Sequence, residues 1–151
     1  MINITNKGQK AVELFHGGYN CAQAVAGAFA EEMGFPLETV LKLAQPFGGG
    51  IGRLREVCGA FSGAVLVIGQ LYGDDAPNSP NKMEVYKIVQ HLAERFREER
   101  GSLVCREILE AMKNDKDQPA DAPKGGHNPG CANMCALSAS ILEEYIREHG
   151  R

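Results

Sequence analysis

Apolar residues recur at helical spacing along most of this chain, and no stretch shows the sustained apolar/polar alternation of a half-buried strand. Val85, Val89 and Phe96, for example, fall on one face of a helix. The pattern predicts an all-α fold, a compact single-domain bundle of about six or seven helices. Helices are expected over residues 7–15 and 21–33, between Pro36 and Pro46, from about Arg53 to Tyr72, and from starts near Ser79, Ser102 and Asn128.

The length of the chain, 151 residues, suits one ordinary domain that spans residues 1–151. A domain of this size buries roughly two thirds of its unfolded surface, so no covalent staple is needed for folding. The segment 113–129 is rich in Asp, Pro, Gly and Lys. We expect it to be a flexible loop within the domain.

Charge and hydropathy exclude several classes of partner. Sixteen Lys and Arg against 19 Asp and Glu give a formal net charge of -3, with no long basic block, so nucleic-acid binding is not expected. The most apolar stretch, 57–73, contains four glycines and is shorter than the roughly 20 residues of a membrane-spanning helix. The first ten residues lack the apolar stretch of a secretory signal. We therefore predict a cytoplasmic protein without membrane insertion.

The chain contains an odd number of cysteines, which weakens a structural-disulfide framework in a reducing compartment. Metal ligation or redox chemistry is the better expectation. The five are Cys21, Cys58, Cys105, Cys131 and Cys135.

Three of these cysteines fall within the first turns of expected helices. Cys21 follows Asn20, Cys105 follows Ser102, and Cys131 follows Asn128. Helix starts present unpaired N–H groups and partial positive charge, which favour the thiolate that binds metals or attacks disulfides. The alternative for any one position is a small buried hydrophobe.

Small residues follow Cys58 at helical spacing. Gly59 and Gly63 are four residues apart, and Ala60 and Ala64 extend the same surface. Such a face lets a cofactor or another helix approach the backbone closely, so Gly59 and Gly63 are candidate cofactor-binding residues, with plain helix packing as the alternative. The same smooth face predicts a symmetric homodimer.

Several segments together resemble the C-GCAxxG-C-C family of redox-active proteins, and the resemblance covers most of the chain. Cys and Gly stand in the opposite order to the family's label in the central motif. The segments are Cys58-Gly59-Ala60-x-x-Gly63, Asn20–Ala24, the corner Phe47–Gly52, Cys105–Glu107 and the cysteine-led last helix.

The resemblance implies one redox or metal site built from four cysteines, which would be both the catalytic residues and the metal ligands. Cys131 is preferred over Cys135 because the number of residues between it and the segment 141–144 is similar to the spacing in the family pattern. Cys135 would then be an extra residue. The four positions are Cys21, Cys58, Cys105 and Cys131.

Four thiolates are the usual ligands of an iron–sulfur cluster, which is the first cofactor to consider. Zinc is the alternative metal, although the short Cys-x-x-Cys knuckles typical of structural zinc sites are absent. A similar domain occurs in split-Soret cytochromes, but this chain has no Cys-x-x-Cys-His and hence no covalent c-type haem site. The expected activity is that of an oxidoreductase or electron-transfer protein with an unknown redox partner; a non-catalytic helical interaction protein with core cysteines is the competing interpretation.

Overall fold

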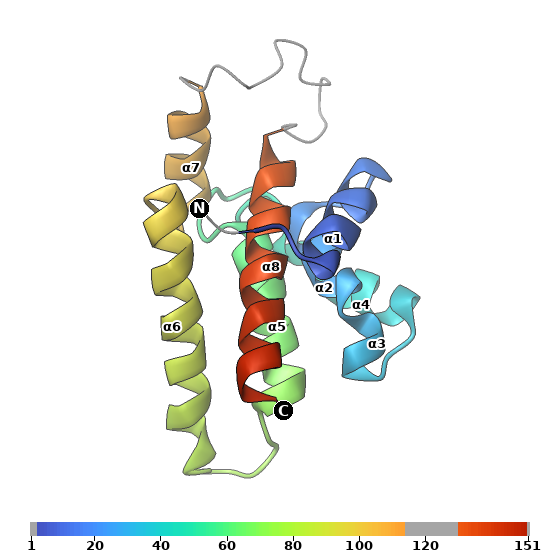
Figure 1. The fold of residues 1–151 in the computed structure, drawn as a ribbon, viewed down its shortest axis with the longest axis vertical. Helices are drawn as coiled ribbons and strands as arrows, with labels where there is room; N and C mark the ends of the chain where they lie inside the picture. The colour runs from blue at the N-terminus through green and yellow to red at the C-terminus, as the bar shows by residue number, and fades with distance from the viewer. Residues whose placement is uncertain (1–2, 114–129, 151) are drawn as a thin grey trace.

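The computed structural model describes residues 3–113 and 130–150, and these residues form a bundle of helices (Figure 1). The predicted all-α fold is confirmed. The described residues form eight α-helices and one short 3-10 helix. They are α1 (Asn6–His16), α2 (Cys21–Ala28), α3 (Ala30–Met33), α4 (Leu37–Ala44), η1 (Gln45–Phe47), α5 (Gly59–Tyr72), α6 (Asn81–Arg100), α7 (Cys105–Met112) and α8 (Cys131–His149).

The helix count exceeds the expected six or seven because the segment predicted as one helix over residues 21–33 divides at Phe29. This residue has φ -108° and ψ 13°, outside helical geometry, and its N–H donates to the carbonyl of Ala26 at 3.1 Å. The Phe29 side chain is buried. Its anchoring in the core turns the chain from α2 into α3, and Gly34, at φ 76°, ends α3 as predicted.

The expected helix start at Arg53 is wrong, because the glycine-rich corner continues through residue 55 as a left-handed stretch. Its backbone is closed by hydrogen bonds from the N–H of Arg53 to the carbonyl of Gly48, at 3.2 Å, and from the N–H of Glu56 to that of Gly50, at 2.9 Å. A right-handed helix cannot include this conformation, so α5 begins only at Gly59. Positive φ values occur at Gly49, Gly50, Ile51, Gly52, Arg53 and Arg55.

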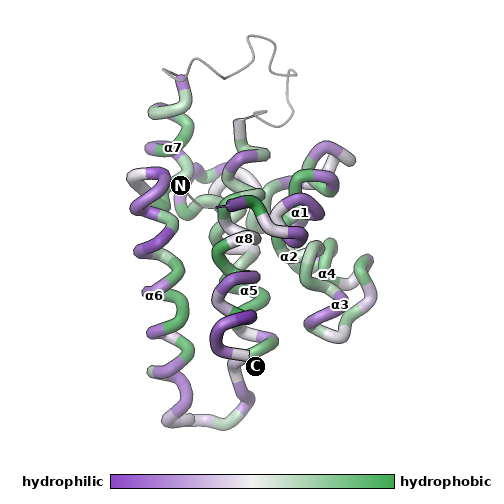
Figure 2. The backbone as a smooth tube through the Cα atoms, in the orientation of Figure 1, coloured by the Kyte–Doolittle hydropathy of each residue, from purple (hydrophilic) through white to green (hydrophobic). Residues whose placement is uncertain are grey.

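The core lies where α5 packs against α2, α6 and α8. Helix α6 presents Leu92 and Phe96 to this core, and Figure 2 shows the hydrophobic side of α6 turned toward α8. The rings of Phe61 in α5 and Phe96 in α6 lie 6.0 Å apart. Amphipathic packing of this kind, not intrinsic propensity, supplies most of the stability of helices in a bundle.

Helices α5 and α8 run in the same direction (Figure 1). Near their ends, the rings of Tyr72 and Tyr145 lie 5.8 Å apart, and the Tyr72 hydroxyl donates to the carbonyl of Gly150. The starts of both helices therefore lie toward the opposite end of the bundle. None of the helices in residues 3–113 and 130–150 is long and apolar enough to cross a membrane. The loop predicted at 113–129 lies, apart from Lys113, outside the described residues.

Candidate cysteine site

Four of the five cysteines stand at helix starts. Cys21, Cys105 and Cys131 are the first residues of α2, α7 and α8, which matches their expected first-turn positions. Cys58 directly precedes α5. Its place at a helix start was missed because that helix was expected to begin at Arg53.

The start of α2 is set by a reciprocal capping box between Asn20 and Gln23. The N–H of Gln23 donates to the Asn20 side chain at 2.9 Å, and the Gln23 side chain accepts from the N–H of Asn20 at 3.0 Å. The Gln23 amide also donates to the carbonyl of Leu41 at 3.0 Å, which ties this turn to α4. These bonds fix the backbone that carries Cys21.

The glycine face of α5 lies against α2. A Cβ atom on Gly63 would lie 2.6 Å from the carbonyl oxygen of Ala22, and one on Gly59 would lie 3.3 Å from the Cβ of Cys21. The two glycines therefore permit the close helix packing that the sequence left open beside a cofactor contact, and this packing places Cys21 next to the start of α5. Since this face is buried within the chain, it supplies no outer surface for the expected dimer.

A single antiparallel bridge between Val57 and Val104 brings the start of α7 to the start of α5. The N–H of Cys58 donates to the carbonyl of Leu103 at 2.7 Å, and the N–H of Cys105 donates to that of Glu56 at 2.5 Å. Alternate residues of paired segments point to the same side, so the bridge places Cys58 and Cys105 as diagonal neighbours.

The left-handed corner completes the surroundings of Cys105. A Cβ atom on Gly50 would lie 2.7 Å from the Cβ of Cys105, so only glycine fits there. The Arg55 guanidinium, at the end of the corner, donates from Nη1 to the Cys105 sulfur at 3.8 Å. The corner thus places the Gly50 backbone and the Arg55 guanidinium next to Cys105.

Cys21 contacts both cysteines of α8. Its thiol lies close enough to those of Cys131 and Cys135 for both to affect its pKa, and the Cys135 thiol donates to the Cys21 carbonyl at 3.9 Å. Cys131 and Cys135 are four residues apart and share a side of α8, which was the sequence signal for this contact. Cys135, expected to be an extra residue, is therefore a neighbour of Cys21. All five cysteines are free thiols.

Burial, not the helix start, controls the ionisation of Cys58. Burial raises the pKa of its thiol from 9.0 to about 12, although the backbone N–H groups of Ala60 and Phe61 act in the opposite direction. The neighbouring cysteines Cys131 and Cys105 raise this pKa further.

The surroundings of Cys21 and Cys131 also favour the protonated state. The interaction with the Cys131 thiol lowers the pKa of Cys21, but the interaction with Cys135 and burial outweigh it, and the Cys21 pKa lies well above its usual value. The interaction with the Cys21 thiol, followed by burial, raises the pKa of Cys131, while the charges of Arg55 and Arg100 lower it. Desolvation and a second thiol therefore oppose the thiolate form that a helix start favours at Cys21 and Cys131.

Thiol donors have the right chemistry for iron–sulfur or zinc centres. In the part of the chain that the structure describes, however, no three or more His, Cys, Asp or Glu side chains are grouped closely enough to hold a metal ion. The cysteines form neighbouring contacts without forming a metal cage.

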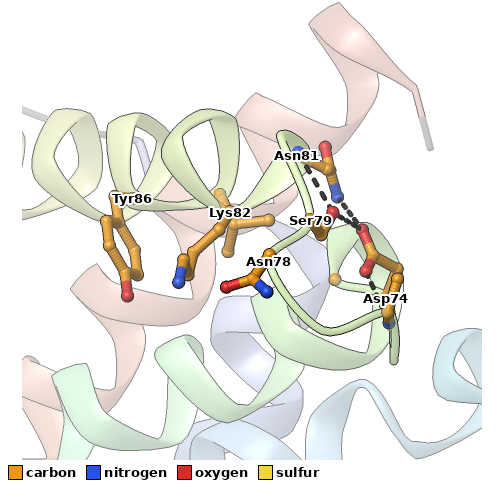
Figure 3. A pocket seen from close by; sticks show the side chains of 9 residues that line it. Asp74, Asn78, Ser79, Asn81, Lys82 and Tyr86 are labelled. Atoms are coloured by element: carbon orange, nitrogen blue, oxygen red, sulfur yellow. Dashed lines mark hydrogen bonds between the residues drawn. The ribbon is translucent and has the colours of Figure 1, made fainter.

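A polar hollow lies between the end of α5 and the start of α6, and it contains no cysteine (Figure 3). The Asp74 carboxylate there accepts hydrogen bonds from the Ser79 hydroxyl at 2.7 Å and from the Asn81 amide at 3.0 Å. Its pKa is lowered by these bonds, Ser79 first, and by the N–H of Ala76. The network belongs to the turn that begins α6.

Comparison with protein families matches the chain to a family described as "Putative redox-active protein (C_GCAxxG_C_C)". No curated protein and no solved structure matches the chain. The family match covers residues 19–145, which include all five cysteines and the glycine face of α5. The chain therefore belongs to the C_GCAxxG_C_C family.

Proposed function

We propose that this chain is a thiol–disulfide redox protein in which Cys21 and Cys131 alternate between two thiols and one disulfide. The observation that carries this function is the position of the two thiols, which lie close enough to affect each other's pKa and come from the starts of two packed helices. Oxidation removes two electrons and two protons from the pair and forms one S–S bond. A reducing cytoplasm suits the five free thiols of the resting protein.

The other cysteines have supporting places in this proposal. Cys58 lies close enough to Cys131 and Cys105 for their charges to affect its pKa. Cys135 contacts Cys21 from one turn further along α8. A disulfide between Cys21 and Cys131 would therefore have thiols beside it that can accept it by exchange.

A second candidate is a thiolate-ligated iron–sulfur or zinc centre. The presence of four cysteines at helix starts that face one region favours it, because four thiolates suit either metal centre. The donor chemistry fits such a centre, whereas the positions described above do not form one. This candidate requires movement of the helix starts to bring the four sulfurs together.

One experiment separates the two candidates. The protein is purified under anaerobic conditions, its iron, zinc and sulfide contents are measured, and it is then equilibrated with mixtures of reduced and oxidised dithiothreitol. The dithiol proposal expects metal-free protein that loses two alkylatable thiols in one reversible step. Stoichiometric metal, together with resistance to oxidation until a chelator is added, would support the metal centre instead.

A further inference from the structure

Two arginines from separate elements border the cysteine site. Arg55 ends the left-handed corner, and its Nη1 lies 3.8 Å from the Cys105 sulfur. Arg100 is the last residue of α6, three positions before Leu103, whose carbonyl accepts the N–H of Cys58. The charges of both arginines also act on Cys131. The positively charged side chains of Arg55 and Arg100 therefore border the site from two separate elements.

The backbone holds Arg55 in this place. Its φ is 61°, a conformation that non-glycine residues rarely adopt. Its N–H donates to the carbonyl of Gly49 at 3.1 Å, and its own carbonyl accepts from the N–H of Arg106 at 3.2 Å. An uncommon backbone conformation persists when surrounding contacts fix it, and here they direct the guanidinium to the cysteines.

Neither guanidinium is neutralised by a carboxylate within residues 3–113 and 130–150. The nearby Glu107 carboxylate accepts from the Ser102 hydroxyl at 2.8 Å, while Glu56 is exposed beside Arg55. The site therefore combines cysteine thiols with two half-buried cations.

We infer that Arg55 and Arg100 form an anion-binding edge of the cysteine site, which selects a small disulfide carrying carboxylate groups as its redox substrate. The inference rests on the proposed function and names the substrate class for it. A small substrate suits the recessed sulfurs, because Cys58 and Cys105 are only 5% and 8% exposed while Cys131 is half-buried. Carboxylates suit guanidinium groups in charge and in geometry.

The thiol–disulfide exchange needs no oxidant or reductant beyond the substrate disulfide and the two cysteine thiols. The Cys131 thiol loses its proton and attacks one sulfur of the substrate disulfide, which breaks the substrate S–S bond, forms a mixed disulfide and releases the first substrate thiolate. The Cys21 thiol then loses its proton and attacks the Cys131 sulfur, which releases the second thiolate. The two thiolates take up the two protons, so one substrate disulfide becomes two thiols and the protein gains one disulfide.

Three disulfides of similar size test the selection: dithiodipropionate, which is anionic, hydroxyethyl disulfide, which is neutral, and cystamine, which is cationic. Oxidation rates are measured by mass spectrometry of the remaining alkylatable thiols in wild type, Arg55→Gln and Arg100→Gln. The matched control is Arg147→Gln, at an exposed ion pair near the far end of α8. The ratio of the dithiodipropionate rate to the cystamine rate is the readout, since a general change in thiol reactivity affects both rates and cancels.

We expect this ratio to fall roughly threefold to tenfold in each site variant, to stay unchanged in Arg147→Gln, and to fall in wild type as salt is raised. An unchanged ratio in both site variants, with all three disulfides still oxidising the cysteines, would overturn the anion-binding edge and leave the redox function standing. Failure of all three to oxidise the wild type would instead overturn the proposed function. If Arg55→Gln does not fold, Arg55→Lys serves in its place, and it should keep a ratio closer to that of wild type than Arg100→Gln does.

Discussion

The two ends of α5 place an ionisable side chain in opposite environments. At its end, the fully exposed Asp74 carboxylate is ionised and surrounded by donors of the turn before α6. At its start, Cys58 is buried and its thiol is held in the neutral form. The first arrangement needs only local residues, whereas the second requires helices from across the chain.

The helix starts also differ among themselves. At the start of α6 the Ser79 hydroxyl accepts the N–H of Asn81 at 3.1 Å, and at the start of α7 the Ser102 hydroxyl accepts the N–H of Val104 at 2.9 Å. The N-cap of α5 is Cys58, whose side chain forms no cap hydrogen bond. A good cap contributes about 1 kcal/mol, so the start of α5 lacks stabilisation that Asn20 supplies at the start of α2.

The largest expected effect separates the two cysteines of α8. Cys131→Ser should abolish disulfide formation at the site, because it removes one member of the proposed redox pair. Cys135→Ser should keep most of it, because Cys21 and Cys131 remain in contact. Both variants are compared by thiol counting after oxidation under anaerobic conditions. The reverse ranking would identify Cys135 as the partner of Cys21.

The next effect concerns the glycine face that joins α5 to α2. Gly63→Ala should lower the free energy of unfolding by about 1–3 kcal/mol, because its Cβ would lie 2.6 Å from the Ala22 carbonyl oxygen. Gly69→Ala, on the exposed side of the same helix with no atom within 4 Å of the added Cβ, should raise it by about 0.5–1 kcal/mol. Urea unfolding of both variants checks this difference. Equal effects would show that the glycine face does not set the packing.

Alkaline pH should destabilise the cysteine end. The Cys58 thiol has a pKa near 9.0 in the unfolded chain and about 12 in the fold, so the folded protein binds more protons between these values. Its contribution is fully present below pH 9 and is lost as the pH rises toward 12, by at most about 1.4 kcal/mol per pH unit. Cys58→Ala should therefore show a shallower fall in unfolding free energy from pH 9 upward. Identical slopes in wild type and variant would contradict the raised pKa.

The smallest effect is expected at the turn. Asp74→Asn should change stability only slightly, because the carboxylate is fully exposed, and it should leave the oxidation rate of the cysteines unchanged. The lowered pKa of Asp74 contributes stability above the usual value of 3.8, which is lost as the pH falls through the folded value. Wild type and Asp74→Asn should therefore converge in acid. A large effect on cysteine oxidation would mean that the two ends are coupled.

Local signals allowed much of the fold to be predicted from the sequence. The helix expected over residues 21–33 begins after Asn20, which forms a capping box with Gln23, and the helical segment ends at Gly34, which adopts a positive φ. The break at Phe29 was not predictable locally, because it depends on the burial of that ring in the assembled core. The delayed start of α5 depends in the same way on pairing with residue 104, far along the chain.

The sequence predicted the helix-start positions of Cys21, Cys105 and Cys131 but not the electrostatics around them. Asn20 and the helix pattern placed Cys21 at a helix start, and the four-residue spacing of Cys131 and Cys135 placed both on one side of α8. The protonation of these thiols depends on burial and on mutual contact, which no spacing reveals. The position of Arg55 depends on a left-handed corner that includes non-glycine residues, for which the sequence gives no signal.

The most direct measurement is the identity of the first disulfide that forms in the wild-type protein. The reduced protein is exposed briefly to a limiting amount of oxidised dithiothreitol, remaining thiols are alkylated in acid, and the linked peptides are identified by mass spectrometry. A bond between Cys21 and Cys131 is the predicted product, because these two thiols lie close enough to affect each other's pKa. A first bond between Cys58 and Cys105, or linkage only between separate molecules, would contradict the Cys21–Cys131 redox pair.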